Sequence, residues 1–295
     1  MNALRRTFGF INKHPLARRN LIIAYSRFFT WQIRSRLSSS MIELSFIESS
    51  KMYAKKGLTG ITGNIYTGLH EFQDMSFLLH LLTDNDLFFD VGANVGAYTI
   101  LASGVKRARS ISFEPISDTY SFLVKNIELN NIKDLVTCVN KGVGSKAATL
   151  YFTNNEDTTN HVLAEKEACK ESTSVDVVTL DSYYPEYQPL LIKVDVEGFE
   201  TEVLNGANEI LKSSFLKAII IELNGSGGRY GYNESEIHQK LLNQGFNVYQ
   251  YNPFARELKL QDNFGNFNTI YIRDIQFIQD RLKNASSFKV FNELL

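Results

Sequence analysis

The sequence predicts an α/β protein with a mostly parallel sheet whose last strand is antiparallel. From residue 86 onward, short apolar runs alternate with helical segments, the pattern of crossover units in a parallel sheet. Near the end, FNVYQYN (246–252) and NTIYIRD (268–274) are two strand-like runs with no helix between them, so we expect them to pair antiparallel. With 295 residues, 44% of them hydrophobic, the chain can bury one large core.

The expected elements follow this alternation. Strands are expected at residues 87–91, 110–114, 136–140, 190–195 and 218–223. Helices fit between them at residues 96–104, 118–130, 199–212 and 234–243. Residues 149–181 interrupt the rhythm with further strand-like runs and a polar excursion, so we interpret them as an insertion.

The first 40 residues are strongly basic. They contain eight Lys or Arg and no Asp or Glu: Arg5, Arg6, Lys13, Arg18, Arg19, Arg27, Arg34 and Arg36. Residues 17–37 predict an amphipathic helix, with Ile22, Tyr25, Phe29 and Ile33 in one apolar row and Leu21 and Phe28 in a second. We expect this helix to cap the main domain, and the alternative is peripheral contact with a membrane or an anionic partner.

Three parts are expected along the chain. Residues 1–58 form a helical N-terminal region, residues 59–283 form the main domain with the insertion at 149–181, and residues 284–295 form a C-terminal tail. The glycine-spaced GLTGITG (57–63) is interpreted as the linker between the first two parts.

Composition excludes several classes of protein. The net charge of -1 provides no overall attraction to nucleic acid, and the oligomeric state is left open. Cys138 and Cys169 cannot form a disulfide framework and lack metal-ligand spacing, which favours a reducing, cytoplasmic compartment. The apolar run 21–31 is interrupted by Ser26 and Arg27 and is shorter than the ~20 residues of a membrane span. We therefore expect a cytoplasmic protein that is at most peripheral to a membrane.

FFDVGANVGAYTI (88–100) combines a buried strand, Asp90, a glycine turn and a helix start. Gly92 and Gly96 allow positive φ angles and the close approach of another group. In the dinucleotide fingerprint a glycine stands where this chain has Asn94. Asparagine would crowd a pyrophosphate but can hydrogen-bond a carboxylate or an amine, so the turn favours S-adenosylmethionine over a nicotinamide dinucleotide.

The next strand ends in SFEP, which places Glu114 at its carboxyl tip. An acidic side chain there can accept hydrogen bonds from both ribose hydroxyls of a nucleoside. Both candidate cofactors contain ribose, so Glu114 does not distinguish them, and taken by itself it could be an ordinary surface glutamate. The turn, the acid and the crossover context together predict a nucleoside cofactor.

LLIKVDVEGFETEVLNGA (190–207) runs off a strand into a helix, and Lys193, Asp195 and Glu197 alternate along it. In an extended strand the three side chains project to one side, at the edge where ligands bind in parallel sheets. They can orient a hydroxyl and accept its proton, with Glu222 on the neighbouring strand as the alternative base. The structural alternatives are Glu197 serving the positive N-terminus of the following helix and Lys193 as a satisfied structural partner.

Metal dependence stays open at this stage. Asp195, Glu197 and Glu222 could supply oxygen ligands for Mg²⁺, although carboxylates at a strand edge more often have other roles. The five histidines form no metal-spaced cluster, so no metal ligand is assigned.

In GLHEF (68–72), His70 and Glu71 precede an apolar helical run, residues 72–82. We expect this helix to pack over the cofactor pocket as a lid, with the polar pair contacting the methionine amine or the acceptor. The alternative is an ordinary helix start with Glu71 in its first turn.

Four segments taken together resemble the FkbM-type methyltransferases, class I enzymes that use S-adenosylmethionine: GLHEFQDMSFLLHLL, DLFFDVGANVGAYTILAS, SFEP and LIKVDVEGFETEVLNGA. The resemblance covers about residues 59–274. It implies a Rossmann-like, seven-stranded sheet with a reversed last strand, and methyl transfer to oxygen on a sugar or glycan or on a secondary metabolite such as a polyketide.

The resemblance also implies roles for individual residues. Gly92, Asn94 and Gly96 would cradle the methionine end, Glu114 would hold the ribose, and Asn140 and Lys141 would lie near the adenine. The expected partner is a small-molecule or glycan acceptor, and the insertion is where family members should differ. Two rival functions remain: a nicotinamide-dependent oxidoreductase, and a non-catalytic module with a degenerate cofactor site.

Overall fold

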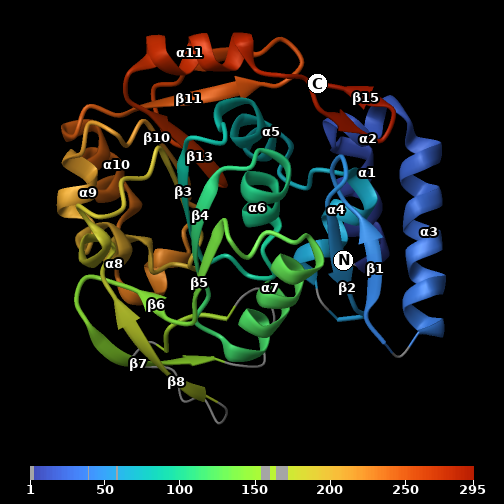
Figure 1. Cartoon of the computed structure of the whole chain (residues 1–295), viewed down its shortest axis with the longest axis horizontal. Coiled ribbons are helices and arrows are strands. Elements are labelled where there is room, and N and C mark those ends of the chain that lie inside the picture. The colour runs from blue at the N-terminus through green and yellow to red at the C-terminus, as the bar shows by residue number, and fades with distance from the viewer. Residues whose placement is uncertain (1–2, 39, 58, 154–159, 164–171) are drawn as a thin grey trace.

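The computed structural model of the chain describes residues 3–38, 40–57, 59–153, 160–163 and 172–295. Its centre is a large sheet with helices on both faces (Figure 1). Within the described residues the sheet has eight strands, in the spatial order β12 (Glu257–Leu260), β11 (Asn247–Asn252), β13 (Asn268–Ile272), β10 (Ala218–Glu222), β9 (Leu191–Val194), β3 (Leu87–Val91), β4 (Arg109–Phe113) and β5 (Val136–Val139).

The strand directions confirm the predicted fold class. β10, β9, β3, β4 and β5 are mutually parallel, whereas β13 runs antiparallel to β10 and also pairs antiparallel with β11. β12 forms an additional antiparallel edge strand beside β11. It makes the sheet eight-stranded rather than seven-stranded, and it was missed because its polar sequence ELKL is largely exposed.

Successive residues of the central strands face opposite helical layers. Phe88 and Ile220 pack against α5 (Phe72–Leu81), α6 (Ala97–Thr99), the π-helix η1 (Ile100–Val105) and α11 (Ile275–Asn284). Phe89 and Ile219 pack against the 3₁₀ turn η3 (Leu180–Tyr183), α8 (Glu200–Asn205), α9 (Asn208–Lys212) and α10 (Glu234–Asn243). Because side chains alternate along a strand, both faces of the sheet are buried, which explains its continuous apolar runs.

The predicted strands of the parallel part agree with the structure to within one or two residues at each end. The helix expected over 199–212 is instead two helices, α8 and α9, because the chain turns at Gly206, where an added Cβ would overlap the carbonyl oxygen of Gly144. α7 (Ser117–Leu129) lies beside β5 and the hairpin described next.

The N-terminal region is a cap of helices and one hairpin: α1 (Ala3–Lys13), α2 (Pro15–Arg19), α3 (Leu21–Leu37), β1 (Ile42–Ser45) and β2 (Lys51–Ala54). The single helix expected over 17–37 is divided at Asn20, whose side chain accepts a hydrogen bond from the Ile23 N–H and caps α3. The hairpin is a correction to the expectation of an entirely helical region.

The linker interpretation of residues 57–63 was wrong, because this segment enters α4 (Thr59–Thr67). An added Cβ at Gly63 would lie only 2.5 Å from Cγ of the His70 ring, so glycine at this position leaves room for the ring. The Thr67 hydroxyl donates to the Gly63 carbonyl within the same helix. At Gly63, the absence of a side chain therefore serves close packing.

The lid prediction for the apolar run 72–82 was also wrong. α5 spans Phe72–Leu81, and its residues from Met75 onward are buried in the core beside α11 and β11. Only its beginning reaches the cavity described below, through Glu71 and Met75.

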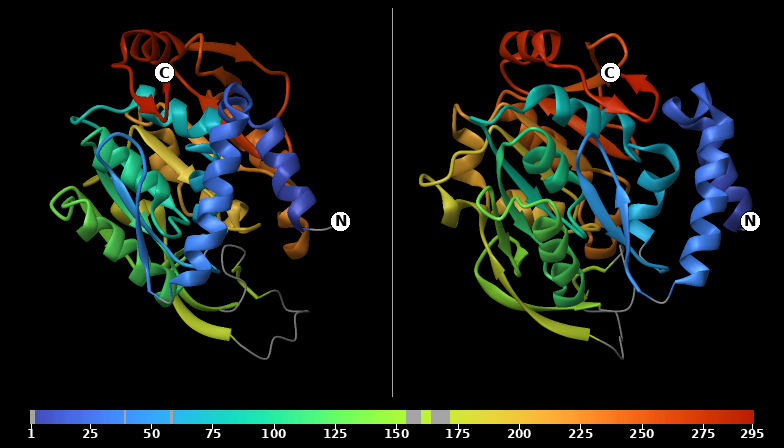
Figure 2. Two further views of the ribbon diagram at one scale, coloured as in Figure 1. Left: turned by 90° about the vertical axis from the view of Figure 1, so that its right-hand side faces the viewer. Right: turned by 45° about the vertical axis from the view of Figure 1, so that its right-hand side comes forward.

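The insertion contributes β8 (Ser172–Val178) and most of β7 (Ala148–Thr153), which form a small sheet with the preceding β6 (Gly142–Val143). Parts of the insertion, including Cys169, lie outside the described residues. The 3₁₀ turn η4 (Ser226–Tyr230) follows β10. The expected tail contains a hairpin of β14 (Lys289–Val290) and β15 (Glu293–Leu294) near the C-terminus (Figure 2). Val290 and Leu295 are buried. No helix in the described part of the chain is long and apolar enough to cross a membrane.

Candidate cofactor and active site

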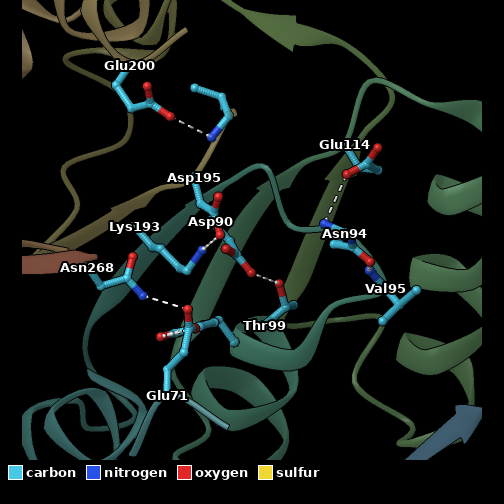
Figure 3. Close-up of polar contacts among 12 residues, drawn as sticks. Glu71, Asp90, Asn94, Val95, Thr99, Glu114, Lys193, Asp195, Glu200 and Asn268 are labelled. Atoms are coloured by element: carbon cyan, nitrogen blue, oxygen red, sulfur yellow. Dashed lines mark hydrogen bonds and ion pairs between the residues drawn. The ribbon is translucent and has the colours of Figure 1, made fainter. Parts of the chain in front are cut away.

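A cavity of about 360 Å³ lies at the carboxyl ends of β3, β4, β9 and β10. β3 pairs with β4, the next strand of the sheet along the chain, on one side and with β9 on its other side. The cavity lies at this point, where the strand order reverses. Ligands of open α/β sheets bind at such a switch point. Four of the predicted site residues that line it are Asp90, Glu114, Lys193 and Asp195 (Figure 3).

The glycine turn has the positive φ angles that the sequence predicts: 81° at Gly92 and 90° at Gly96. The groups that approach these glycines most closely belong to the protein itself. An added Cβ at Gly92 would overlap the carbonyl oxygen of Asp195, and one at Gly96 would lie 2.6 Å from Cδ1 of Leu123. Gly92 therefore lets the loops after β3 and β9 meet, which brings the end of β9 against the turn.

Glu114 is buried, so the surface-glutamate alternative was wrong. Its carboxylate accepts hydrogen bonds from the Asn94 N–H at 3.0 Å and from the Ile116 N–H at 2.9 Å. Burial raises its pKa to about 7, although the two hydrogen bonds stabilise the charged carboxylate and act to lower the pKa. The Asn94 side chain accepts from the Val95 N–H at 2.7 Å and so braces the turn (Figure 3).

Asn140 and Lys141 are separated by the structure. Asn140 is exposed, does not line the cavity, and donates to the carbonyls of Glu114 and Pro115, which braces the loop after β4. Lys141 does line the cavity. The predicted contact of each with adenine stays a prediction.

Buried Lys193 and partly exposed Asp195 form an ion pair, with Nζ 2.8 Å from Oδ2. Burial opposes the positive charge, but the carboxylates of Asp195, Glu71 and Asp90 outweigh it and hold the pKa of Lys193 above its usual value. The ammonium also lies 4.8 Å from the centre of the Tyr98 ring. Lys193 is thus a buried ion-pair partner, the structural alternative weighed from the sequence, and it also lines the cavity.

Asp90 and Glu71 surround the same cation. Asp90 is buried and accepts from the Thr99 hydroxyl at 2.7 Å, while burial raises its pKa. Glu71 accepts from the Tyr98 hydroxyl and the Asn268 side chain, both at 2.7 Å (Figure 3). Its side chain makes no capping bond to α5, so Glu71 serves the cavity rather than the helix start.

Asp195, Glu197 and Glu222 each bring a carboxylate oxygen within 4.8 Å of the others. Burial, followed by repulsion from Asp195, raises the pKa of Glu197 to about 7 and that of Glu222 to about 8. Such a cluster could hold protons or a divalent cation. Lys193 already compensates the charge of Asp195, which favours the proton-holding arrangement.

Glu200 holds the loop that carries this cluster. It is buried and accepts from the N–H groups of Val196 and Gly198, both at 3.1 Å. Burial raises its pKa to about 7. Glu197, the residue between them, has a positive φ of 54°. Glu200 thus holds the loop just before α8 through its hydrogen bonds. From the sequence, Glu197 was the residue considered for a role at the N-terminus of this helix.

Four contributors were missed from the sequence: Tyr98, Glu200, Asn268 and Asn64. Tyr98 and Glu200 lie within the quoted motifs, so their position was a usable signal. Asn64 and Asn268 lie on α4 and β13, and only the fold brings Asn64 to the cavity lining and Asn268 against Glu71.

Raised carboxyl pKa values predict a pH-dependent stability. Glu222 has a pKa near 8 when folded, against an ordinary value of 4.5, so the folded chain holds a proton that the unfolded chain releases between these pH values. The stabilisation is complete below about pH 4.5 and is lost as the pH rises through about 8. Denaturant titrations across this range should show the free energy of unfolding falling with pH. The slope should be shallower in Glu222→Gln and unchanged in Glu236→Gln, which alters an exposed residue of α10; an unchanged slope in Glu222→Gln would contradict the assignment.

Comparison with known proteins identifies the family. A family model described as the methyltransferase FkbM domain matches residues 90–248, more than half of the chain. The chain belongs to the FkbM methyltransferase family. The matched region begins at Asp90 and includes the glycine turn, Glu114 and the strand edge from Lys193 to Glu222, so the cavity of this FkbM methyltransferase is built largely from the family's own region.

Two curated relatives of this FkbM methyltransferase are similar over part of their length. Methyltransferase sdnD of Sordaria araneosa is 30% identical over 172 residues, which cover 47% of this chain and 66% of sdnD. Hexuronic acid methyltransferase AglP of Haloferax volcanii is 29% identical over 149 residues, which cover 50% of this chain and 59% of AglP. The chain therefore spans less than two thirds of either relative. The crystal structure of methyltransferase FkbM from Methylobacillus flagellatus KT is 16% identical with a TM-score of 0.45, covering 65% of this chain and 44% of that one.

Proposed function

We propose that this FkbM methyltransferase transfers a methyl group from S-adenosylmethionine to a hydroxyl oxygen of a sugar, a glycan or a secondary metabolite. The observation that carries the proposal is the Lys193–Asp195 ion pair, which lies with Glu197 and Glu222 in the same cavity as the glycine turn. This arrangement supports proton removal from a hydroxyl next to a nucleoside site.

The residues of the cavity fit S-adenosylmethionine. Each Glu114 oxygen accepts one backbone N–H and keeps a further lone pair for a ribose hydroxyl. Asn64 is buried and lines the cavity, and its Nδ2 has no hydrogen-bond partner among the described residues. That amide suits a carboxylate such as the methionine end carries, and Glu71 suits its amine.

The protein must supply alignment and proton removal, because the bound cofactor supplies an electrophilic methyl group. Transfer to oxygen is an in-line displacement, and holding the acceptor in line can lower the barrier by several kcal/mol. Asp195 would accept the hydroxyl proton, with Lys193 at 2.8 Å orienting its carboxylate and sharing the developing charge. A positioned base contributes about 10² to 10⁴ in rate.

The acceptor class follows from the polar lining. Carboxylates accept hydrogen bonds from hydroxyls, so three of them suit a polyhydroxylated acceptor. AglP is named for a hexuronic acid, which supports a sugar. We therefore propose a sugar or another polyol as the acceptor.

Two measurements test this function. Calorimetry should show binding of S-adenosylmethionine; tight binding of NAD without S-adenosylmethionine would instead support the nicotinamide-dependent rival. A transfer screen with labelled cofactor over cell glycans, lipid-linked sugars and small phenols should label a hydroxyl. Cofactor binding with no labelled acceptor in the screen would favour the non-catalytic module.

Glu114→Ala is expected to weaken S-adenosylmethionine binding about ten- to hundredfold, because it removes charge-assisted hydrogen bonds to the ribose. Calorimetry measures the change, and Glu236→Ala on the exposed face of α10 is the control. Since Glu114 also braces the turn through Asn94, thermal unfolding is recorded alongside. Unchanged affinity in a folded variant would remove Glu114 from the cofactor site.

A further inference from the structure

The outer face of α3 consists of Ile22, Phe29, Ile33 and Leu37. Their exposed fractions are 83%, 55%, 60% and 83%. Spacings of seven, four and four residues place them on one side of the helix. The opposite side, formed by Ala24, Phe28, Trp31 and Ser35, is buried against the rest of the cap. α3 therefore has two apolar sides, and the fold uses only one of them.

The position of α3 leaves this face uncovered. α3 stands at the periphery of the molecule, beyond α4, in both Figure 1 and the right panel of Figure 2. The other strongly exposed large apolar residues, such as Phe215, Leu260 and Phe267, are distributed over separate elements. Single exposed apolar residues are ordinary, but a row along one helix marks an interaction surface.

The charge around the outer face indicates the kind of partner. Arg36 follows Ile33 by three residues and Arg34 precedes Leu37 by three, so arginines border the apolar row. Arg5, Arg6, Lys13 and Arg18 are also exposed, and none of these six cations has a carboxylate partner within the described residues.

The two remaining cations of the first 40 residues are engaged by the fold. Arg19 pairs with Glu293 at 2.9 Å, and Arg27 donates to the Ile65 carbonyl and stacks on the Phe291 ring. Arg34 and Arg36, which border the outer face, therefore have no carboxylate partner within the described residues and suit an anionic partner.

We propose that the outer face of α3 docks on the surface of an anionic lipid bilayer. The helix would lie in the plane of the interface, with its four apolar side chains at the level of the acyl-chain boundary and the arginines among the anionic headgroups. A second copy of the chain is the poorer occupant, because a symmetric contact would set the same face, with Arg34 and Arg36, against itself.

Docking would place the cavity close to the membrane. α3 packs on α4, and α4 supplies Gly60 and Asn64 to the lining of the cavity. The active site therefore lies one helix away from the proposed membrane-facing surface. This inference stands on α3 by itself and does not depend on the identity of the methyl acceptor.

Vesicle flotation of the full chain tests the proposal, with vesicles of phosphatidylcholine either pure or containing a third of phosphatidylglycerol. The wild type should float with the anionic vesicles at low salt, much less with the neutral ones, and progressively less as salt screens the arginines. Failure to float with anionic vesicles at low salt would overturn the proposal. Equal binding to both kinds of vesicle would overturn its electrostatic part.

Two variants and one control locate the contact. Replacing Ile22, Phe29, Ile33 and Leu37 together with Ser should reduce binding at least about tenfold, and Arg34→Glu/Arg36→Glu should do the same for anionic vesicles. Phe215→Ser/Leu260→Ser/Phe267→Ser, which removes exposed apolar residues elsewhere, should bind like the wild type. Reduced binding in this control would contradict the assignment to α3.

Two further measurements separate membrane docking from misfolding and from self-association. All variants change exposed side chains, so circular dichroism and S-adenosylmethionine affinity should match the wild type. Light scattering determines the oligomeric state. A dimer that the four Ser substitutions dissociate would show that a second copy, rather than a bilayer, covers this face.

Discussion

Asp195→Asn is expected to lose at least about a hundredfold in turnover while keeping the fold and most of the affinity for S-adenosylmethionine. The amide keeps the shape of the side chain but cannot accept the hydroxyl proton. Folding should survive because Lys193 keeps the carboxylates of Glu71 and Asp90 nearby. Single-turnover transfer of a labelled methyl group measures the loss, and Asp262→Asn, at an exposed position, is the matched control.

The neighbouring residues should form a graded series. Lys193→Met should lose less turnover than Asp195→Asn, because it removes the orienting cation rather than the base. Glu197→Gln should lose the least. Turnover of Asp195→Asn within a few-fold of the wild type would show that the base is misassigned. Glu222, whose pKa near 8 suits proton acceptance near neutral pH, would then take the role.

Gly92→Ala is expected to abolish cofactor binding and to lower the free energy of unfolding by about 3 kcal/mol or more, since strain and steric overlap add. Gly92 has a φ of 81°, and an added Cβ would overlap the Asp195 carbonyl oxygen, a backbone atom that cannot rotate away. The loops after β3 and β9 would have to separate, which disrupts the turn and the catalytic edge together. Denaturant unfolding and calorimetry measure the two effects.

Two other glycines separate the causes. Gly231 has a φ of 78° but nothing within 4 Å of an added Cβ, so Gly231→Ala should cost about 1 kcal/mol from backbone strain only. Gly265 has neither a positive φ nor a close neighbour, and Gly265→Ala should change stability by less than about 0.5 kcal/mol. If Gly92→Ala were no worse than Gly231→Ala, the steric argument would fail.

The sheet was predictable because local sequence carries its signal. β3, β4, β9 and β10 are largely buried on both faces, so each appears as a short apolar run bounded by polar residues. Segments whose role depends on packing were misjudged. The glycines of α4 indicated a linker, yet Gly63 makes room for the His70 ring, and the apolar run of α5 indicated a lid, yet it is buried in the core.

The candidate site likewise has a part that the local sequence predicts and a part that depends on packing. The motifs on β3, β4 and β9 place Asp90, Glu114, Lys193 and Asp195 at strand ends, and the ends of parallel strands meet at one edge. Their surroundings could not be anticipated. Contacts such as that of Glu71 with Asn268, which lie 197 residues apart, exist only once the sheet has formed.

By itself the sequence determined the α/β class, the antiparallel last strand, the glycine turn and the carboxylates at the strand ends, because each rests on residues close together in the chain. Only the tertiary structure decided how these groups are used. It buries Lys193 among carboxylates, raises the pKa of Glu197 and Glu222, and places Asn64 in the lining of the cavity. It also decided which apolar side of α3 is covered, since burial depends on the neighbours that folding brings together and not on the period of the helix.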